Sequence, residues 1–299
     1  MGSTFDGQRA WEDIDRFCAL GPRMCGSKEL GLLREMIAQR IHDLGGEIRL
    51  ERFSVEPPSL QGDRQEGINL IASLGPRDGE RLLLATHFDT RPRAEEETLL
   101  ERQQMPILGA NDGASGVAVL LEIGRLLSRS APTIGVDLAF FDAEEYVFDP
   151  ETDPLVLGSI HFASQISNPE VYQAAVVVDI VGRSGQILSP DIDSWYLSRS
   201  LVQELWDVAD RLAESMQATW FDREVRYEVL DDHIPLLSVG IPSLCLIDVD
   251  DPRWHTLDDR PEHCHPQALA EVGQVLWEWL LVRMRARAGS ESGSESPTS

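Results

Sequence analysis

Apolar residues along this chain follow two patterns: short continuous runs, and longer segments in which they recur every three or four positions. The short runs, rich in β-branched and aromatic residues, predict buried strands, and the periodic segments predict amphipathic helices. We expect strands at residues 47–55, 69–74, 82–86, 136–141, 174–181 and 243–247. The helical pattern covers residues 11–18, 30–41, 117–127, 194–216 and 265–287, and a short helix starts at Gly158.

The alternation of strands with helices predicts a single α/β domain over residues 1–287. The expected fold is a three-layer sandwich, with helices on both faces of a mixed, mostly parallel sheet. Residues 288–299 are rich in glycine, serine and glutamate, so we expect a disordered polar tail there. Residues 90–108 show little periodicity, and a structureless loop of that length in a compact domain is usually functional or mobile.

The apolar run at residues 136–141 ends abruptly in acidic residues, namely Asp142, Glu144 and Glu145. A buried strand would deliver these side chains to the edge where open α/β sheets place their chemistry. Adjacent carboxylates are costly to hold together unless a cation lies between them or one of them keeps its proton. The alternative is a solvated turn, because glutamate is usually exposed.

Other acidic and histidine residues also follow predicted strands or open predicted helices. Together with Glu145, the set is His87, Asp112, Asp179 and His255. Two imidazoles and three carboxylates on separate elements suit one zinc ion or a bridged pair of zinc ions. Asp112 taken alone could instead cap a helix, and Asp179 could be a structural carboxylate with satisfied hydrogen bonds.

Charge and composition narrow the possible partners. The 299 residues carry 51 Asp and Glu against 26 Lys and Arg, a net charge of −25, which argues against nucleic acid or an anionic membrane and favours cationic peptides or metal ions. No apolar run reaches the roughly 20 residues of a membrane helix, and the N-terminus lacks the apolar centre of a signal peptide, so a cytoplasmic protein is expected. The sequence leaves the oligomeric state open, and we favour a monomer. Four cysteines without a C-x-x-C pair predict free thiols.

Several motifs then occur in a recognisable order. They are L-G-P-R-M-C-G-S (20–27), G-A-N-D-G-A-S-G (109–116), F-F-D-A-E-E-Y (140–146), L-G-S-I-H-F-A (157–163), V-V-D-I-V-G (177–182), D-D-H-I-P-L (231–236) and W-H-T-L-D-D (254–259). In this order and at these spacings they resemble the zinc-dependent glutaminyl cyclases, or glutaminyl-peptide cyclotransferases. That family shares a clan with the bacterial zinc aminopeptidases, and the main resemblance runs from about residue 83 to residue 259.

The resemblance implies a zinc site. Asp112, Glu145 and His255 would be its ligands. His87 and Asp179 fill the two positions that let the aminopeptidases hold a second zinc ion, although the cyclases retain similar residues without doing so. Ligand identities alone therefore leave one or two zinc ions possible.

The resemblance also implies roles around a peptide with a free N-terminal glutamine, which would be converted to pyroglutamate with release of ammonia. Glu144 would be the proton shuttle, consistent with a carboxylate that lies beside a ligand without being one. Asp179 and Asp231 would complete an acidic network around the substrate amine. Trp254 would form a wall of the pocket.

Two positions depart from the animal cyclases. Pro150 stands where they have a pocket tryptophan, and Cys245 stands where they have a histidine, so we expect a different pocket rim. An aminopeptidase and a metal-free binding scaffold are the alternative functions. The motif D-D-H-I-P and the tryptophan before His255 favour the cyclase, because aminopeptidases tend to show S-D-H and no tryptophan.

The remaining histidines have structural interpretations. We expect His233 to orient its loop or a neighbouring carboxylate, and the triplet His263, Cys264 and His265 to lie at a helix entry. His42 and His161 are expected to be surface or packing residues.

Overall fold

The structure, a computed structural model, describes residues 4–216 and 220–292 and contains one six-stranded sheet in the order β1-β2-β4-β3-β5-β6. Strands β4, β3, β5 and β6 are parallel, whereas β1 and β2 form an antiparallel pair at one edge. The strands are β1 (Glu47–Val55), β2 (Gln65–Leu74), β3 (Arg81–His87), β4 (Gly135–Phe141), β5 (Tyr172–Asp179) and β6 (Ser243–Ile247). The predicted mixed, mostly parallel sheet is confirmed.

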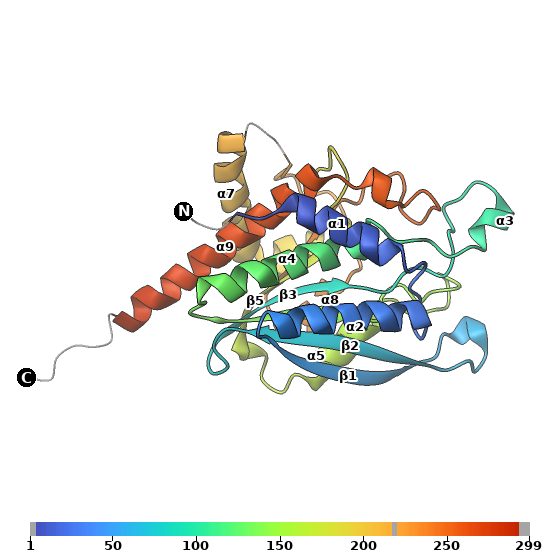
Figure 1. The fold of residues 1–299 in the computed structure, drawn as a ribbon, viewed down its shortest axis with the longest axis horizontal. Helices are drawn as coiled ribbons and strands as arrows, with labels where there is room; N and C mark the ends of the chain where they lie inside the picture. Colours follow the sequence, from blue (N-terminus) through green and yellow to red (C-terminus); the bar gives the residue numbers. More distant parts are fainter. Residues whose placement is uncertain (1–3, 217–219, 293–299) are drawn as a thin grey trace, which may run out of the picture.

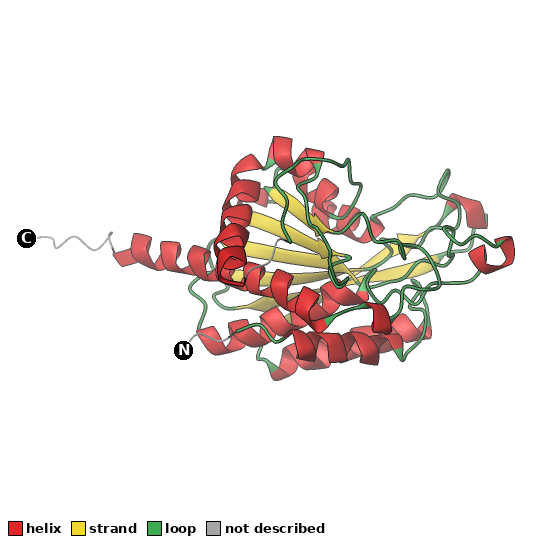
Figure 2. Ribbon diagram, turned by 90° about the horizontal axis from the view of Figure 1, so that it is seen from above, coloured by secondary structure: helices red, strands yellow, loops and turns green. Residues whose placement is uncertain are grey.

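Helices cover both faces of this sheet (Figures 1 and 2). Their bounds are α1 (Gly7–Cys18), α2 (Lys28–Asp43), α3 (Leu100–Gln103), α4 (Ala114–Ser130), α5 (Leu157–Gln165), α6 (Ile192–Leu197), α7 (Arg199–Met216), α8 (His233–Ser238) and α9 (Pro266–Ser292). Helices α1, α2, α4, α7 and α9 share the larger core, and α5 and α8 share the smaller one. Within the described residues, none of the helices combines the length and apolar character needed to cross a membrane.

Successive side chains along a central strand point alternately into the larger and the smaller hydrophobic core. Leu82 and Leu84 of β3 belong to the larger core, while Leu83 and Ala85 belong to the smaller one. Because both faces are covered, these strands appear in the sequence as continuous apolar runs rather than alternating ones. The three-layer sandwich predicted from the sequence is confirmed.

Several predicted boundaries were wrong. The segment predicted as one helix over residues 194–216 is two helices, because the backbone leaves the helical region at Ser198, whose hydroxyl accepts a hydrogen bond from the backbone N–H of Ser243 in β6. The loop predicted at residues 90–108 contains the short helix α3.

The last helix also differs from the prediction. It continues past residue 287 to Ser292, so the first part of the predicted disordered tail is helical, whereas residues 293–299 lie outside the described residues. Extending an existing helix avoids the costly nucleation step, which explains why residues of low helix propensity can join it.

The parallel strands all place their carboxyl ends at one edge of the sheet. β3 lies between β4 and β5, and the chain moves from β3 to β4 on one side and then to β5 on the other. This reversal is the topological switch point at which open α/β sheets bind ligands. At the adjacent start of α4, Gly116 lets the helix approach the sheet, since an added Cβ atom would collide with the Thr86 side chain and the Val178 carbonyl oxygen.

Replacing Gly116 with alanine should therefore destabilise the protein by about 1–3 kcal/mol, because the clash involves backbone that cannot move aside. Gly124→Ala in the same helix is the matched control. Its Cβ would meet the Leu138 side chain at 3.2 Å, and alanine favours a helix interior by about 0.5–1 kcal/mol over glycine. Urea unfolding of the two variants tests this, and equal stabilities would contradict it.

Candidate metal centre and active site

The structure brings the five strand-end residues together into two groups that share Asp112. One group is Asp112, Glu145 and His255, and the other is His87, Asp112 and Asp179. All five are buried, and within each group the potential ligand atoms lie within 4.8 Å of one another. These side chains come from four separate strand ends or loops and from the start of α4.

Asp112 lies between two imidazole rings. The Nε2 atom of His255 is 3.5 Å from Asp112 Oδ2 and 3.3 Å from Glu145 Oε1. On the other side, His87 Nε2 is 3.3 Å from Asp112 Oδ1 and 3.0 Å from Asp179 Oδ1. The two groups are therefore continuous through one carboxylate.

The carboxylate of Asp112 fits a metal ligand better than a helix cap. Helix α4 has Gly113 as its N-cap and no side-chain cap, so the interpretation of Asp112 as a cap is wrong. Both carboxylate oxygens of Asp112 are buried, and neither has a hydrogen-bond partner among the described residues. Leaving a carboxylate in this state is costly, and a nitrogen and oxygen donor set of this kind suits zinc.

Two further carboxylates hold the backbone of the centre, and the sequence analysis gave them no role. Asp89 accepts hydrogen bonds from the backbone N–H groups of Glu144 and Glu145 at 3.2 and 3.1 Å. Asp259 does the same for Asn111 and Asp112 at 2.7 and 3.1 Å. Asp89 follows a strand and Asp259 lies in the W-H-T-L-D-D motif, so their positions were visible but their backbone contacts were not.

The glutamate pair lies inside the protein, so the solvated-turn alternative is wrong. Glu144 and Glu145 are 5% and 6% exposed. Burial acts to raise the pKa of Glu145, but the charges of His255 and Arg91 outweigh it and hold this pKa well below its ordinary value. Arg91 Nη1 lies 2.9 Å from Glu145 Oε2, a contact that the sequence did not reveal.

Three non-glycine residues at the site have positive φ angles. Ala143 (56°) precedes Glu144, Ile180 (48°) follows Asp179, and His255 (52°) is itself a site residue. Such backbone is strained for residues with a Cβ atom, and it persists only where the surrounding structure holds it. The chain therefore maintains strain at each of the segments that bring Glu144, Asp179 and His255 to the centre.

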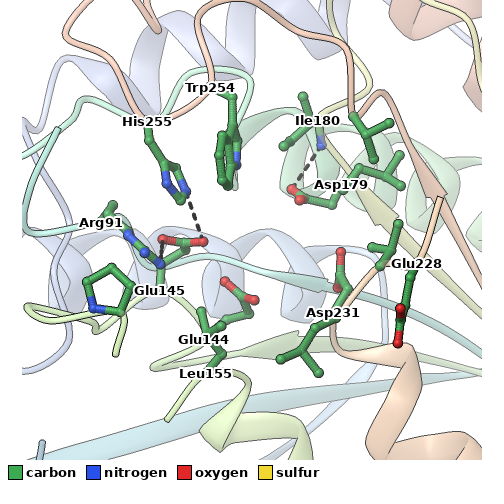
Figure 3. Close-up of a pocket in the computed structure, with 15 residues that line it drawn as sticks. Arg91, Glu144, Glu145, Leu155, Asp179, Ile180, Glu228, Asp231, Trp254 and His255 are labelled. Carbon is green, nitrogen blue, oxygen red and sulfur yellow. Dashed lines mark hydrogen bonds and ion pairs between the residues drawn. The ribbon is translucent and has the colours of Figure 1, made fainter. Parts of the chain in front are cut away.

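A cavity of about 420 Å³ opens onto this centre (Figure 3). The carboxylates of Glu144, Asp179 and Asp231 all reach it, and Trp254 stacks on the His255 ring with the ring centroids 3.7 Å apart. The other lining residues are Arg91, Glu145, Pro150, Leu155, Ile180, Glu228, Val229, Leu230, Ile247, Val249 and His255. The cavity thus joins an acidic inner end to largely apolar walls.

Glu144 is a buried acid of this cavity that belongs to none of the groups of potential metal ligands among the described residues. Burial, followed by the negative charge of Glu145, raises the pKa of Glu144 well above its ordinary value. A buried carboxyl group whose pKa is raised above its ordinary value is suited to exchange a proton with a substrate.

The two positions that depart from the animal cyclases lie at different depths. Pro150 lines the cavity, so its replacement of an aromatic residue changes the wall. Cys245 is buried behind the cavity, where its thiol donates to Asp231 Oδ2 at 3.3 Å. His233 contacts the Asp191 carboxylate at 3.2 Å, and its ring also lies in a group with Asp231 and Cys245.

The remaining cysteine and histidine predictions agree with the structure. All four cysteines are buried free thiols, as expected. His263 and Cys264 lie at the turn that leads into α9, His42 is exposed, and His161 stacks on Phe53 with the ring centroids 5.0 Å apart.

Comparisons with known proteins agree with this geometry. A family model described as peptidase family M28 matches residues 69–280, which is more than half of the chain. The chain therefore belongs to peptidase family M28.

The individual proteins similar to this chain include glutaminyl cyclases and an aminopeptidase. The crystal structure of Fimbriiglobus ruber glutaminyl cyclase is 32% identical, with a TM-score of 0.88, and the match covers 94% of this chain and 97% of that one. The glutaminyl-peptide cyclotransferase of Bos taurus is 26% identical over 87% of this chain and 78% of that protein. A leucine aminopeptidase precursor from Bacteroides thetaiotaomicron is 26% identical, with a TM-score of 0.87, over 94% of this chain and 98% of that one. The predicted resemblance to the glutaminyl cyclases, within the aminopeptidase clan, is confirmed.

Proposed function

We propose that this chain is a zinc-dependent glutaminyl-peptide cyclotransferase that converts the N-terminal glutamine of peptides to pyroglutamate and releases ammonia. The observation that carries the proposal is the cavity, in which Glu144, Asp179 and Asp231 face the group formed by Asp112, Glu145 and His255. A site of this kind offers a metal, a proton carrier and anionic groups for an amine within one enclosed space. The similarity to glutaminyl cyclases supports the same reaction.

Asp112, Glu145 and His255 are the proposed ligands of one catalytic zinc ion. The unpartnered oxygens of Asp112 support this assignment because they are left free to bind a metal. The lowered pKa of Glu145 supports it because this carboxylate is available as an anion. When bound there, zinc supplies Lewis acidity that polarises the γ-carboxamide of the substrate glutamine.

The acidic residues would then bind and deprotonate the amine. Asp179 and Asp231 hold the α-amine of the substrate near its own γ-carbon. Glu144 accepts a proton as the amine nitrogen bonds to that carbon, and returns it to the nitrogen that leaves as ammonia. One C–N bond forms, one C–N bond breaks, and no water is consumed.

The apolar walls explain how the cavity could favour ring closure. Leu155, Ile180, Val229 and Trp254 line the space beside the acidic end, where they can contact the methylene groups of a glutamine side chain and exclude water. Holding the amine and the carboxamide of one residue in a folded conformation turns a slow cyclisation into an oriented intramolecular step.

A zinc aminopeptidase is the second candidate, and the group His87, Asp112 and Asp179 favours it. A second zinc ion held there would share Asp112 with the first, and Asp179 would no longer be free to bind an amine. In that case Glu144 would serve as the base for a hydrolytic water. A metal-free scaffold is disfavoured because every proposed ligand position is intact.

Substrate choice separates the two candidates. Peptides that begin with glutamine should lose the mass of one ammonia, whereas peptides that begin with leucine should stay intact, because only glutamine carries a γ-carboxamide for its amine to attack. Mass spectrometry of both reactions measures this. Free leucine whose release rises with added zinc would instead establish the aminopeptidase.

Glu144→Gln should retain the fold and the zinc content of the parent but lose most of the activity, by about 10²–10⁴-fold, because glutamine keeps the shape and cannot carry the proton. Glu170→Gln is the control and should keep full activity, because Glu170 is exposed and precedes β5, at the end of that strand opposite Asp179. Turnover of the Glu144 variant at the parental rate would refute the assignment. Loss of zinc in that variant would show that Glu144 is a ligand.

A further inference from the structure

The three consecutive glutamates of the 90–108 segment lie against the loop that carries His255. Glu95 Oε1 is 2.7 Å from His255 Nδ1, and the backbone N–H of Glu96 donates to the His255 carbonyl oxygen at 3.3 Å. Glu97 Oε1 accepts a hydrogen bond from the backbone N–H of Leu257 at 3.1 Å. We call residues 95–97 the acidic clamp, since they contact the histidine loop at three successive points.

The histidine loop is a segment that needs such support. His255 is buried and has a φ angle of 52°, which disfavours any residue with a side chain. A residue held in this conformation would relax if its neighbours did not fix both its backbone and its ring. The clamp contacts both, because Glu96 contacts the carbonyl oxygen and Glu95 contacts the imidazole.

Glu95 also lies beside the ring nitrogen of His255 that faces away from Asp112 and Glu145. With a carboxylate 2.7 Å from Nδ1, the proton of the neutral ring is favoured on Nδ1, which leaves the lone pair of Nε2 directed at Asp112 and Glu145. A carboxylate placed behind a histidine in this way fixes the ring orientation and strengthens its binding of a metal.

One buried guanidinium connects the clamp to the opposite ligand. Arg91 Nη2 is 2.6 Å from Glu95 Oε1, and Arg91 Nη1 is 2.9 Å from Glu145 Oε2. Arg91 therefore compensates the charge of both carboxylates and sets the spacing between the support of His255 and the carboxylate of Glu145.

The far end of the clamp is fixed by α3. Arg102 donates from Nε and Nη2 to the two carboxylate oxygens of Glu97, each at 2.9 Å, and Gln103 donates to the Glu97 carbonyl oxygen at 2.7 Å. These contacts connect the acidic clamp to α3.

We propose that Glu95, held by Arg91, is a positioning residue that fixes the His255 imidazole for zinc binding. The inference rests on the proposed role of His255 as a ligand. It assigns a role to the three-glutamate cluster, which the reaction itself leaves unused.

Zinc affinity measured by chelator competition tests the proposal, with Glu95→Ala, Glu95→Gln and, as the matched control, Glu96→Ala. The Glu96 side chain is exposed, and its contact with His255 uses only the backbone, so the control should bind zinc as the parent does. Glu95→Ala should bind zinc about 10–100-fold more weakly. The zinc affinity of Glu95→Gln should lie between those of Glu96→Ala and Glu95→Ala, because an uncharged acceptor holds the imidazole ring less strongly than a carboxylate does.

The absorption spectrum of the cobalt-substituted protein gives a second measurement that general destabilisation would not reproduce. It should change in Glu95→Ala and stay parental in Glu96→Ala, because only the first alters a ligand orientation. If Glu95→Ala does not fold, the zinc affinity of Glu95→Gln is the deciding measurement. A Glu95→Gln variant that binds zinc as tightly as Glu96→Ala would overturn the proposal.

Zinc binding by the parent protein and by the Glu95 variants distinguishes a wrong ligand set from a wrong role for Glu95. A parent protein that binds no zinc would overturn the proposed ligand set and this inference together. A parent that binds zinc, with a Glu95→Ala variant of equal affinity and equal cobalt spectrum, would overturn this inference alone.

Discussion

The accumulation of buried carboxylates around Asp112 is the constraint on which the rest of the structure depends. Asp112, Glu144, Glu145 and Asp179 share one edge of the sheet, each at most 7% exposed, and the oxygens of Asp112 have no hydrogen-bond partner among the described residues. Mutual repulsion and lost hydration would oppose folding if all of these groups were charged and nothing positive lay between them. A bound cation removes this conflict, which is why the same arrangement suits zinc chemistry.

The surrounding architecture can be understood as support for that arrangement. The order β4-β3-β5 places three strand ends side by side, and Asp89 and Asp259 fix the turns that follow by accepting backbone N–H groups. Arg91 contributes a positive charge beside Glu145, and the strained backbone at His255 is held from outside by the acidic clamp. The same loops thus hold the acidic side chains of the site in place and keep the backbone of His255 in its strained conformation.

The sequence predicted the elements that depend on local pattern. The strand at residues 243–247 was predicted with the bounds that the structure gives, and the strand ends that carry Glu145 and Asp179 were placed within two residues, because apolar runs mark buried strands directly. The positions of the proposed zinc ligands followed from those strand ends. The family resemblance then supplied their roles.

What the sequence did not reveal depends on contacts between distant segments. The break between α6 and α7 reflects a hydrogen bond from Ser243 to Ser198, and no local pattern encodes it. The support of His255 by Glu95 joins residues far apart in the chain, so the sequence analysis assigned no role to the three glutamates. Pairings of this kind require the folded geometry.

Thermal unfolding of the parent and of Asp112→Asn, each with excess chelator and with zinc, tests the central claim most directly. Without metal the variant should be more stable than the parent, because it removes one of several buried carboxylates that repel one another. Zinc should stabilise the parent, by about 2.7 kcal/mol at a hundredfold excess over its dissociation constant, and should leave the variant almost unchanged. A metal-free variant that is less stable than the parent, with both proteins stabilised equally by zinc, would contradict the account.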